Sequence, residues 1–138
     1  MKERSFLDTN ILIYTDDASE AEKSELAAEL VANALRTRKG VISTQVLQEY
    51  FSASTRKLKV GIETAKRRTQ LFTRLNVVQI TPSDIVAAID LVQLHRLSFW
   101  DALIVHAARQ AECAVLLTED LQNGRVIDGV RISNPFNR

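Results

Sequence analysis

Hydrophobic and polar residues follow two different periods along the chain, which divides it into short strands and amphipathic helices. Apolar residues spaced three and four apart predict helices at about 19–38, 44–60, 62–75, 82–97 and 98–111. Short apolar runs predict strands at about 4–7, 41–43, 77–80, 114–117 and 126–132. Because strands and helices alternate, we expect an α/β fold in which helices flank both faces of a mainly parallel central sheet.

Residues with strong positional preferences mark where these elements begin and end. Ser19 and Ser98 are expected to cap helices, and Pro82 suits the first position of the helix that follows Thr81. Gly40 is interpreted as the stop of the helix over 19–38, and Gly61 as a break between two helices. In the helix over 82–97, one face carries the apolar residues Ile85, Ile89 and Val92.

Length and composition indicate a single domain over 1–138, because domains most often have about 100–150 residues. The one cysteine, Cys113, cannot form an internal disulfide, and its alanine neighbours favour an inert core thiol. The N-terminus lacks the apolar run of a signal peptide, and no stretch is apolar enough to span a membrane. The expected location is the cytoplasm.

Charge is distributed unevenly along a chain whose formal net charge is only +1. Residues 54–76 carry a net charge of +6, which leaves −5 for the rest. Such a division suits a protein that attracts a polyanion to one side and holds cations on the other, although charge alone favours a solvated helix face. The candidate contacts to a polyanion are Arg56, Lys57, Lys59, Lys66, Arg67 and Arg68.

Acidic residues follow two of the predicted strands directly. Asp8 ends the run Phe6-Leu7-Asp8, and Glu119 and Asp120 follow the apolar strand at 114–117. Ligands of open α/β sheets bind beyond the carboxyl ends of the strands, so these acids are expected at one edge. Asp101, in the first turn of its helix, and Glu49, in the helix after the second strand, can reach the same edge.

Clustered carboxylates are the hard oxygen ligands that Mg²⁺ and Mn²⁺ prefer, and a divalent cation would relieve their mutual repulsion. Asp8, Glu49, Asp101 and Asp120 are therefore the candidate catalytic and metal-binding residues. Thr9, Asn10 and Thr118 are candidates for orienting these ligands through hydrogen bonds.

Each of these residues also has an ordinary explanation. Asp101 stands three residues after Ser98, the spacing of a helix capping box, while Asp8 and Asp120 suit turns and Glu49 suits an exposed helix face.

Other residues are assigned no chemistry: we interpret Asp16, Asp17, Glu20 and Glu22 as loop and helix-end charges, and His95 and His106 as structural. Phe99 and Trp100 either stack a nucleic-acid base or, as is commoner, pack at the start of their helix.

Four segments in this order make the chain resemble a PIN domain, and in particular the VapC-like ribonuclease toxins of bacterial toxin–antitoxin pairs. The segments are Phe6-Leu7-Asp8-Thr9-Asn10-Ile11-Leu12, Val46-Leu47-Gln48-Glu49-Tyr50, Ser98-Phe99-Trp100-Asp101-Ala102-Leu103-Ile104 and Leu116-Leu117-Thr118-Glu119-Asp120-Leu121. The tail from Gly124 to Phe136 is similar to one branch of that family.

The resemblance implies a three-layer α/β/α fold in which Asp8, Glu49, Asp101 and Asp120 bind Mg²⁺ or Mn²⁺, with Thr118 close by. It implies a homodimer that pairs with an antitoxin protein and cleaves RNA, leaving a 5′-phosphate and a 3′-hydroxyl. Glu119 adjoins Asp120, and the offset from Thr118 favours Asp120 as the acid that faces the metal. Asp128 is interpreted as a hairpin residue rather than a further ligand.

Three rival functions remain open. A PIN nuclease that is no toxin would process RNA or structured DNA, and a catalytically silent module would bind RNA without cleaving it. A phosphatase with an aspartyl nucleophile after the first strand usually has a second Asp two residues later, where this chain has Asn10.

Overall fold

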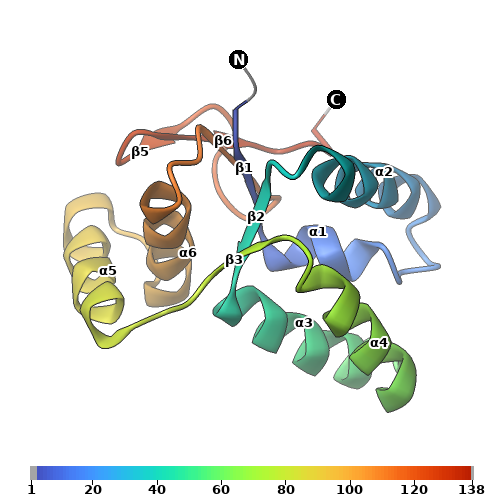
Figure 1. Ribbon diagram of the computed structural model, residues 1–138. Helices are drawn as coiled ribbons and strands as arrows, with labels where there is room; N and C mark the ends of the chain where they lie inside the picture. Colours follow the sequence, from blue (N-terminus) through green and yellow to red (C-terminus); the bar gives the residue numbers. More distant parts are fainter. Residues whose placement is uncertain (1–2, 138) are drawn as a thin grey trace.

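A computed structural model describes residues 3–137, and its centre is a six-stranded sheet (Figure 1). The strand order is β3-β2-β1-β4-β6-β5, and every neighbouring pair is parallel except β5 and β6. The strands are β1 (Ser5–Leu7), β2 (Gly40–Ser43), β3 (Asn76–Val78), β4 (Val115–Leu117), β5 (Val126–Ile127) and β6 (Val130–Ser133). The predicted mainly parallel sheet is confirmed.

Helices cover both faces of this sheet, which confirms the three-layer α/β/α fold. The helices are α1 (Thr9–Tyr14), α2 (Ala21–Thr37), α3 (Thr44–Arg56), α4 (Ile62–Phe72), α5 (Pro82–His95) and α6 (Phe99–Gln110). In Figure 1, α5 and α6 lie on one side of the strands, and the other four helices lie on the opposite side. Among residues 3–137, no helix has both the length and the apolar character that crossing a membrane requires.

The central strands β1, β2 and β4 are buried because helices cover them from both sides. Phe6 pairs in register with Val41 of β2 and Leu116 of β4, and all three side chains are fully buried. Buried parallel strands of this kind read as continuous apolar runs. Since β1 is flanked by two parallel neighbours, the residues that follow β1 and β4 emerge at the same edge of the sheet.

Helix caps explain most, but not all, of the observed boundaries. Ser43 and Ser98 cap α3 and α6 through their hydroxyl groups, and Thr81 and Asp84 form a full capping box at α5. The expected cap at Ser19 is wrong: α2 begins at Ala21, and the Ser19 hydroxyl donates to Asp17 Oδ1 at 2.5 Å instead.

The interpretation of Gly40 as a helix stop is also wrong. The helix α2 ends at Arg38, which takes the left-handed conformation (φ 61°), and Gly40 lies inside β2. A Cβ atom at position 40 would stand 2.4 Å from Cβ of Ala34, so the glycine allows α2 to approach the sheet closely.

The end of the chain forms a hairpin where one strand was expected. Strands β5 and β6 are antiparallel and are joined by Asp128 and Gly129, which have φ values of 51° and 84°. A two-residue hairpin turn needs positive φ at both positions, and Asp-Gly is a favoured pair for it. The interpretation of Asp128 as a hairpin residue is confirmed.

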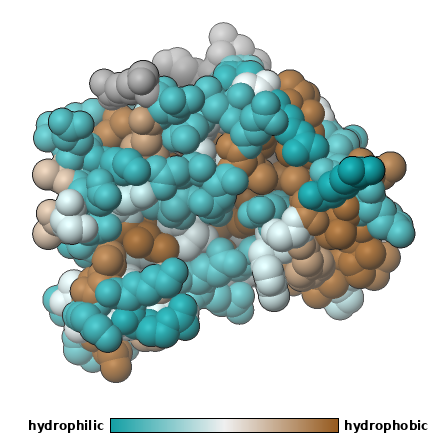
Figure 2. Space-filling model, turned by 180° about the vertical axis from the view of Figure 1, so that it is seen from behind, coloured by the Kyte–Doolittle hydropathy of each residue, from teal (hydrophilic) through white to brown (hydrophobic). Residues whose placement is uncertain are grey.

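Helix α5 buries a different face from the one its apolar residues indicate. The buried residues are Asp84, Ala88 and Leu91, whereas Ile85 and Ile89 are 41% and 49% exposed. Asp84 tolerates burial because its carboxylate is hydrogen-bonded to Thr81 and to His106 of α6. Figure 2 shows hydrophobic residues gathered on the side of the molecule where α5 lies.

Cys113 lies in the core, as expected of an inert thiol. It is a free, buried cysteine, and burial raises the pKa of its thiol to about 12. Since the thiolate is the reactive form, this side chain is a poor nucleophile at neutral pH.

Candidate active site

Asp8 stands at the carboxyl end of β1, where its side chain also begins α1. Its Oδ1 accepts a hydrogen bond of 2.7 Å from the backbone N–H of Thr9, and its Oδ2 accepts one of 2.8 Å from the Thr118 hydroxyl. Only 5% of the residue is exposed. Burial raises the pKa of this carboxyl to about 7, although the hydrogen bonds from Thr118 and Thr9 act to lower it.

Glu49 reaches the same edge from α3. Its Oε1 accepts a hydrogen bond of 2.6 Å from the Thr9 hydroxyl, and its Oε2 accepts one of 3.1 Å from Nε2 of Gln45. The same Gln45 amide donates to the backbone oxygen of Trp100 in α6 at 3.2 Å. Gln45, which the sequence analysis did not single out, therefore links α3 to the helix that carries Asp101.

Asp120 follows β4 and is joined to Asp8 by two neutral side chains. Nδ2 of Asn10 donates to Asp120 Oδ2 at 3.0 Å and to the Thr118 hydroxyl at 3.3 Å. It also lies 3.5 Å from Asp8 Oδ2. The Thr118 oxygen accepts the backbone N–H of Asp120 at 3.0 Å. Asn10 and Thr118 are therefore hydrogen-bonded to two of the predicted acids.

Asp101 is the third residue of α6, and its backbone N–H donates to the Ser98 hydroxyl at 3.1 Å. Partial burial raises the pKa of its carboxyl, and the negative charges of Asp120 and Glu49 raise it further. The same two charges raise the pKa of Asp8. The charges of Asp120 and Glu49 thus act on both Asp8 and Asp101.

In this structure, the four carboxylates do not surround a common point at which they could all bind one metal ion. Among residues 3–137, no group of three or more His, Cys, Asp or Glu side chains is placed to hold a metal ion together. Neutral hydrogen-bonding groups stand between the acids: Thr9 lies between Asp8 and Glu49, and Asn10 lies between Asp8 and Asp120.

The donor set nevertheless fits a hard divalent cation. It consists of carboxylate, hydroxyl and amide oxygens, which are the ligands that Mg²⁺ and Mn²⁺ prefer. Oε1 of Gln45 is buried and has no hydrogen-bond partner among the described residues, so this region holds an unused acceptor beside Glu49.

The sequence over this site matches a known family. The family model of the PIN domain matches residues 5–126, which include all four acids. The chain belongs to the PIN domain family. No curated protein sequence matches the chain.

Several solved structures share this PIN fold over most of their length. The DNA-bound VapBC complex from Salmonella typhimurium matches with a TM-score of 0.69 at 22% identity, covering 97% of this chain and 99% of that chain. A toxin–antitoxin complex from Klebsiella pneumoniae has a TM-score of 0.67 at 21% identity, covering 96% and 98%. VapC20 of Mycobacterium tuberculosis, a toxin that cleaves the sarcin-ricin loop, has a TM-score of 0.62 at 21% identity, covering 84% and 89%. At such identities, the similarity establishes a common fold.

The basic region of this PIN domain lies on α4 and the end of α3. Arg56, Lys57, Lys59, Lys66 and Arg67 are exposed there. Arg68 differs from them, because its Nε lies 2.8 Å from Oδ1 of Asp16, whose side chain is only 4% exposed. Tyr50 donates to the other oxygen of Asp16 at 2.5 Å. The interpretation of Asp16 as an ordinary loop charge is therefore wrong.

The histidine His106 has the structural role predicted for it. Its Nε2 lies 2.8 Å from Oδ1 of Asp84 across the contact between α5 and α6. Hydrogen bonds from the Thr81 backbone and from His106 lower the pKa of Asp84. The pair therefore joins α5 to α6 in the PIN domain.

Phe99 and Trp100, which flank the acidic site, have different surroundings. Phe99 packs against the core, whereas Trp100 is 61% exposed, and their rings meet edge to face at 5.0 Å. Packing at the start of α6 thus describes Phe99 but not Trp100.

Proposed function

We propose that this PIN domain is a Mg²⁺- or Mn²⁺-dependent endoribonuclease that hydrolyses RNA phosphodiester bonds. The observation that carries this proposal is a chain of hydrogen bonds that links Glu49, Asp8 and Asp120 through Thr9, Thr118 and Asn10 at the end of the central strands. The charges of Glu49 and Asp120 also raise the pKa of Asp101, which supports its place in the same site. Membership of a family of nucleases supports the reaction class.

In this proposal, Asp8, Glu49, Asp101 and Asp120 hold the cation. When bound, a divalent cation supplies Lewis acidity towards water and phosphate oxygens. Asp8 is already fixed by Thr9 and Thr118, and Asn10 fixes Asp120, so these ligands lose little freedom on binding. The exposed basic side chains of α3 and α4 bind the RNA backbone, and Arg68 supports α4 rather than contacting RNA.

The cellular role that we propose is that of a toxin in a type II toxin–antitoxin system. Support comes from the solved structures of similar fold, which include two toxin–antitoxin complexes and one toxin that cleaves the sarcin-ricin loop. On this proposal, the protein pairs with an antitoxin protein and acts in the cytoplasm, where its RNA substrate occurs.

We further propose that the chain is one domain and that it forms a homodimer. A single sheet takes strands from both ends of the chain, which supports one domain over 1–138. The exposed apolar residues Ile85, Val86 and Ile89 of α5 support a protein–protein contact, because such patches mark interaction surfaces.

The test is cleavage of total RNA by the purified protein with Mg²⁺, with Mn²⁺ and with a chelator. We expect cleavage only with a divalent ion and none by Asp8→Asn or Asp101→Asn, each with an unchanged circular dichroism spectrum. Mapping of transcript ends after induction of wild type and Asp101→Asn identifies the cleavage site. RNA binding without cleavage under all these conditions would instead establish a silent RNA-binding module.

A further inference from the structure

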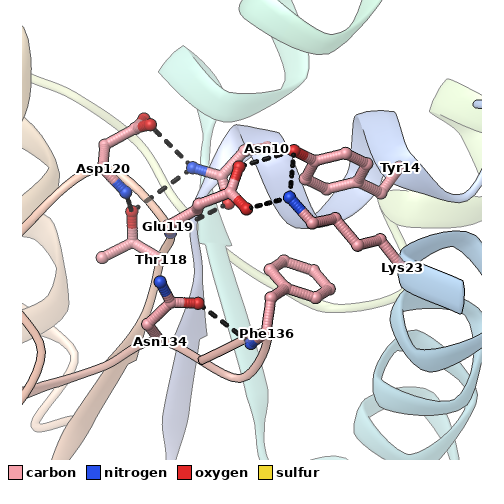
Figure 3. A network of polar contacts seen from close by, with 8 residues as sticks. All are labelled: Asn10, Tyr14, Lys23, Thr118, Glu119, Asp120, Asn134 and Phe136. Carbon is pink, nitrogen blue, oxygen red and sulfur yellow. Dashed lines mark hydrogen bonds and ion pairs between the residues drawn. The ribbon is translucent and has the colours of Figure 1, made fainter. Parts of the chain in front are cut away.

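The adjacent acids Glu119 and Asp120 have different partners in the structure. Glu119 is turned towards α1 and α2, where Tyr14 donates to its Oε1 at 2.5 Å and Lys23 donates to its Oε2 at 2.6 Å (Figure 3). Lys23 also donates to the Tyr14 oxygen at 3.3 Å. The three polar groups therefore form a closed triangle that joins segments about 100 residues apart in the sequence.

Two members of this triangle, Lys23 and Glu119, form an ion pair. The side chains of Lys23 and Glu119 are 34% and 28% exposed. Although partial burial acts to raise the pKa of Glu119, the hydrogen bonds from Lys23 and Tyr14 lower it below its usual value. Hydrogen bonds to Glu119 and Tyr14 raise the pKa of Lys23. Because Tyr14 and Lys23 donate to both carboxylate oxygens of Glu119, this side chain is not free to compete with Asp120 for a cation.

An aromatic side chain near the end of the chain covers the ion pair. The ring of Phe136 meets the ring of Tyr14 edge to face at 5.0 Å. Nζ of Lys23 lies 5.7 Å from the centre of the Phe136 ring and 5.0 Å from that of Tyr14. The segment is held in turn by Asn134, whose Oδ1 accepts the backbone N–H of Phe136 at 2.9 Å (Figure 3).

The loop between Thr118 and Asp120 is therefore held from two sides. On one side, Oδ1 of Asn10 accepts the backbone N–H of Glu119 at 3.3 Å, and its Nδ2 donates to Asp120 at 3.0 Å. On the other side, the Glu119 side chain is fixed by Lys23 and Tyr14. The Asp120 carboxylate, unlike that of Glu119, is linked through Asn10 to Asp8.

We propose that Tyr14, Lys23, Glu119 and Phe136 form a clamp that positions Asp120 for metal binding and cleavage. Lys23 and Glu119 act as positioning residues, since their contacts are with each other and with the loop rather than with the acidic site. The part of this inference that concerns cleavage rests on the proposed ribonuclease function.

The decisive variants are Lys23→Met and Glu119→Gln, with Lys39→Met and Glu112→Gln as matched controls on exposed residues. Two properties of the RNA-free protein are measured: amide hydrogen exchange at residues 118–121, and Mn²⁺ affinity by calorimetry. We expect faster exchange at these amides and a loss of about tenfold in Mn²⁺ affinity, the usual effect of removing a group that orients a metal ligand. Lys23→Arg, which keeps the charge, should recover most of this loss.

Cleavage assays add a non-additivity test. If the clamp acts through Asp120, then Lys23→Met lowers the cleavage rate in wild type but has no further effect in the Asp120→Asn background. Unchanged exchange at residues 118–121 in both Lys23→Met and Glu119→Gln would overturn the clamp, whether or not the protein cleaves RNA. Faster exchange in a protein that cleaves no RNA would support the clamp while the proposed function fails.

Discussion

Thr9 donates a hydrogen bond of 2.6 Å to Oε1 of Glu49, which joins the first residue of α1 to the second turn of α3. Because the backbone N–H of the same residue donates to Asp8, Thr9 sets two of the four acids relative to each other. This relationship explains how residues 41 positions apart come to serve one site.

Replacing Thr9 by Val should lower metal-dependent RNA cleavage by about tenfold, because Glu49 loses the donor that orients it. The change keeps the shape of the side chain, and the backbone bond to Asp8 is unaffected. Cleavage rate and Mn²⁺ affinity are measured together with the thermal midpoint. Thr69→Val, which removes a hydroxyl bonded within α4, serves as the control. Equal activity of the two variants would remove Thr9 from the site.

Asp8 should make the metal-free protein less stable as the pH rises from about 4 to 7. The folded state raises the pKa of Asp8 to about 7 from an ordinary value of 3.8, so between these values it holds a proton that the unfolded chain releases. Stability is therefore lost as the pH rises through this window. Asp8→Asn abolishes the loss and should be more stable than wild type at pH 7.5 by about 1–4 kcal/mol.

Urea denaturation of both proteins in a chelator, from pH 4 to 7.5, measures this difference. Addition of Mn²⁺ should restore wild type at pH 7.5 and leave Asp8→Asn unchanged, because the cation replaces the proton on the carboxylate. A constant difference in unfolding free energy across this pH range would contradict the assignment of the raised pKa to Asp8.

Arg67 and Arg68 are neighbours with different expected effects. Arg67→Gln should flatten the salt dependence of RNA binding by about one unit of slope without changing stability. Arg68→Gln should instead cost about 1–2 kcal/mol of unfolding free energy, because it leaves the buried charge of Asp16 with Tyr50 as its remaining partner. The result that would reverse this assignment is a changed salt slope in Arg68→Gln with unaltered urea denaturation.

Asp84→Ala should destabilise the protein by about 1–3 kcal/mol, because it removes the acceptor shared by the Thr81 cap and His106. The control is Asp90→Ala, an exposed position on the same helix, which should change the unfolding free energy by less than about 0.5 kcal/mol. The urea midpoints of the two variants give the comparison. Similar values would mean that the contact between α5 and α6 depends on the apolar residues alone.

The sequence was sufficient to predict the sheet and the edge at which Asp8 and Asp120 lie, because both follow from rules that act locally. Asp8 and Asp120 each follow a short apolar run. In a parallel sheet such residues lie at the carboxyl edge, whichever strands are their neighbours. The short helix α1 was missed because Asp8 suited a turn as well as a helix cap.

The partners of the acids could not be predicted in the same way. Lys23 and Glu119 are 96 residues apart, and nothing in either local sequence indicates that α2 passes the loop after β4. Gln45 was within reach of prediction, since it precedes Glu49 by four residues and such residues are neighbours on a helix. Ser19 and Gly40 were misassigned because residues that suit helix ends also suit loops and close packing.

Gly40 has a consequence beyond the contact at its own position. Ala34, which lies against Gly40, is eleven positions from Lys23 in α2, and at 1.5 Å per residue this is about 16 Å along the helix. A methyl group at position 40 would push the Ala34 end of α2 away from the sheet, and because the helix is rigid, the end that carries Lys23 would move as well. The absence of a side chain at Gly40 therefore determines how α2 is inclined to the sheet, and with it where Lys23 lies relative to Glu119.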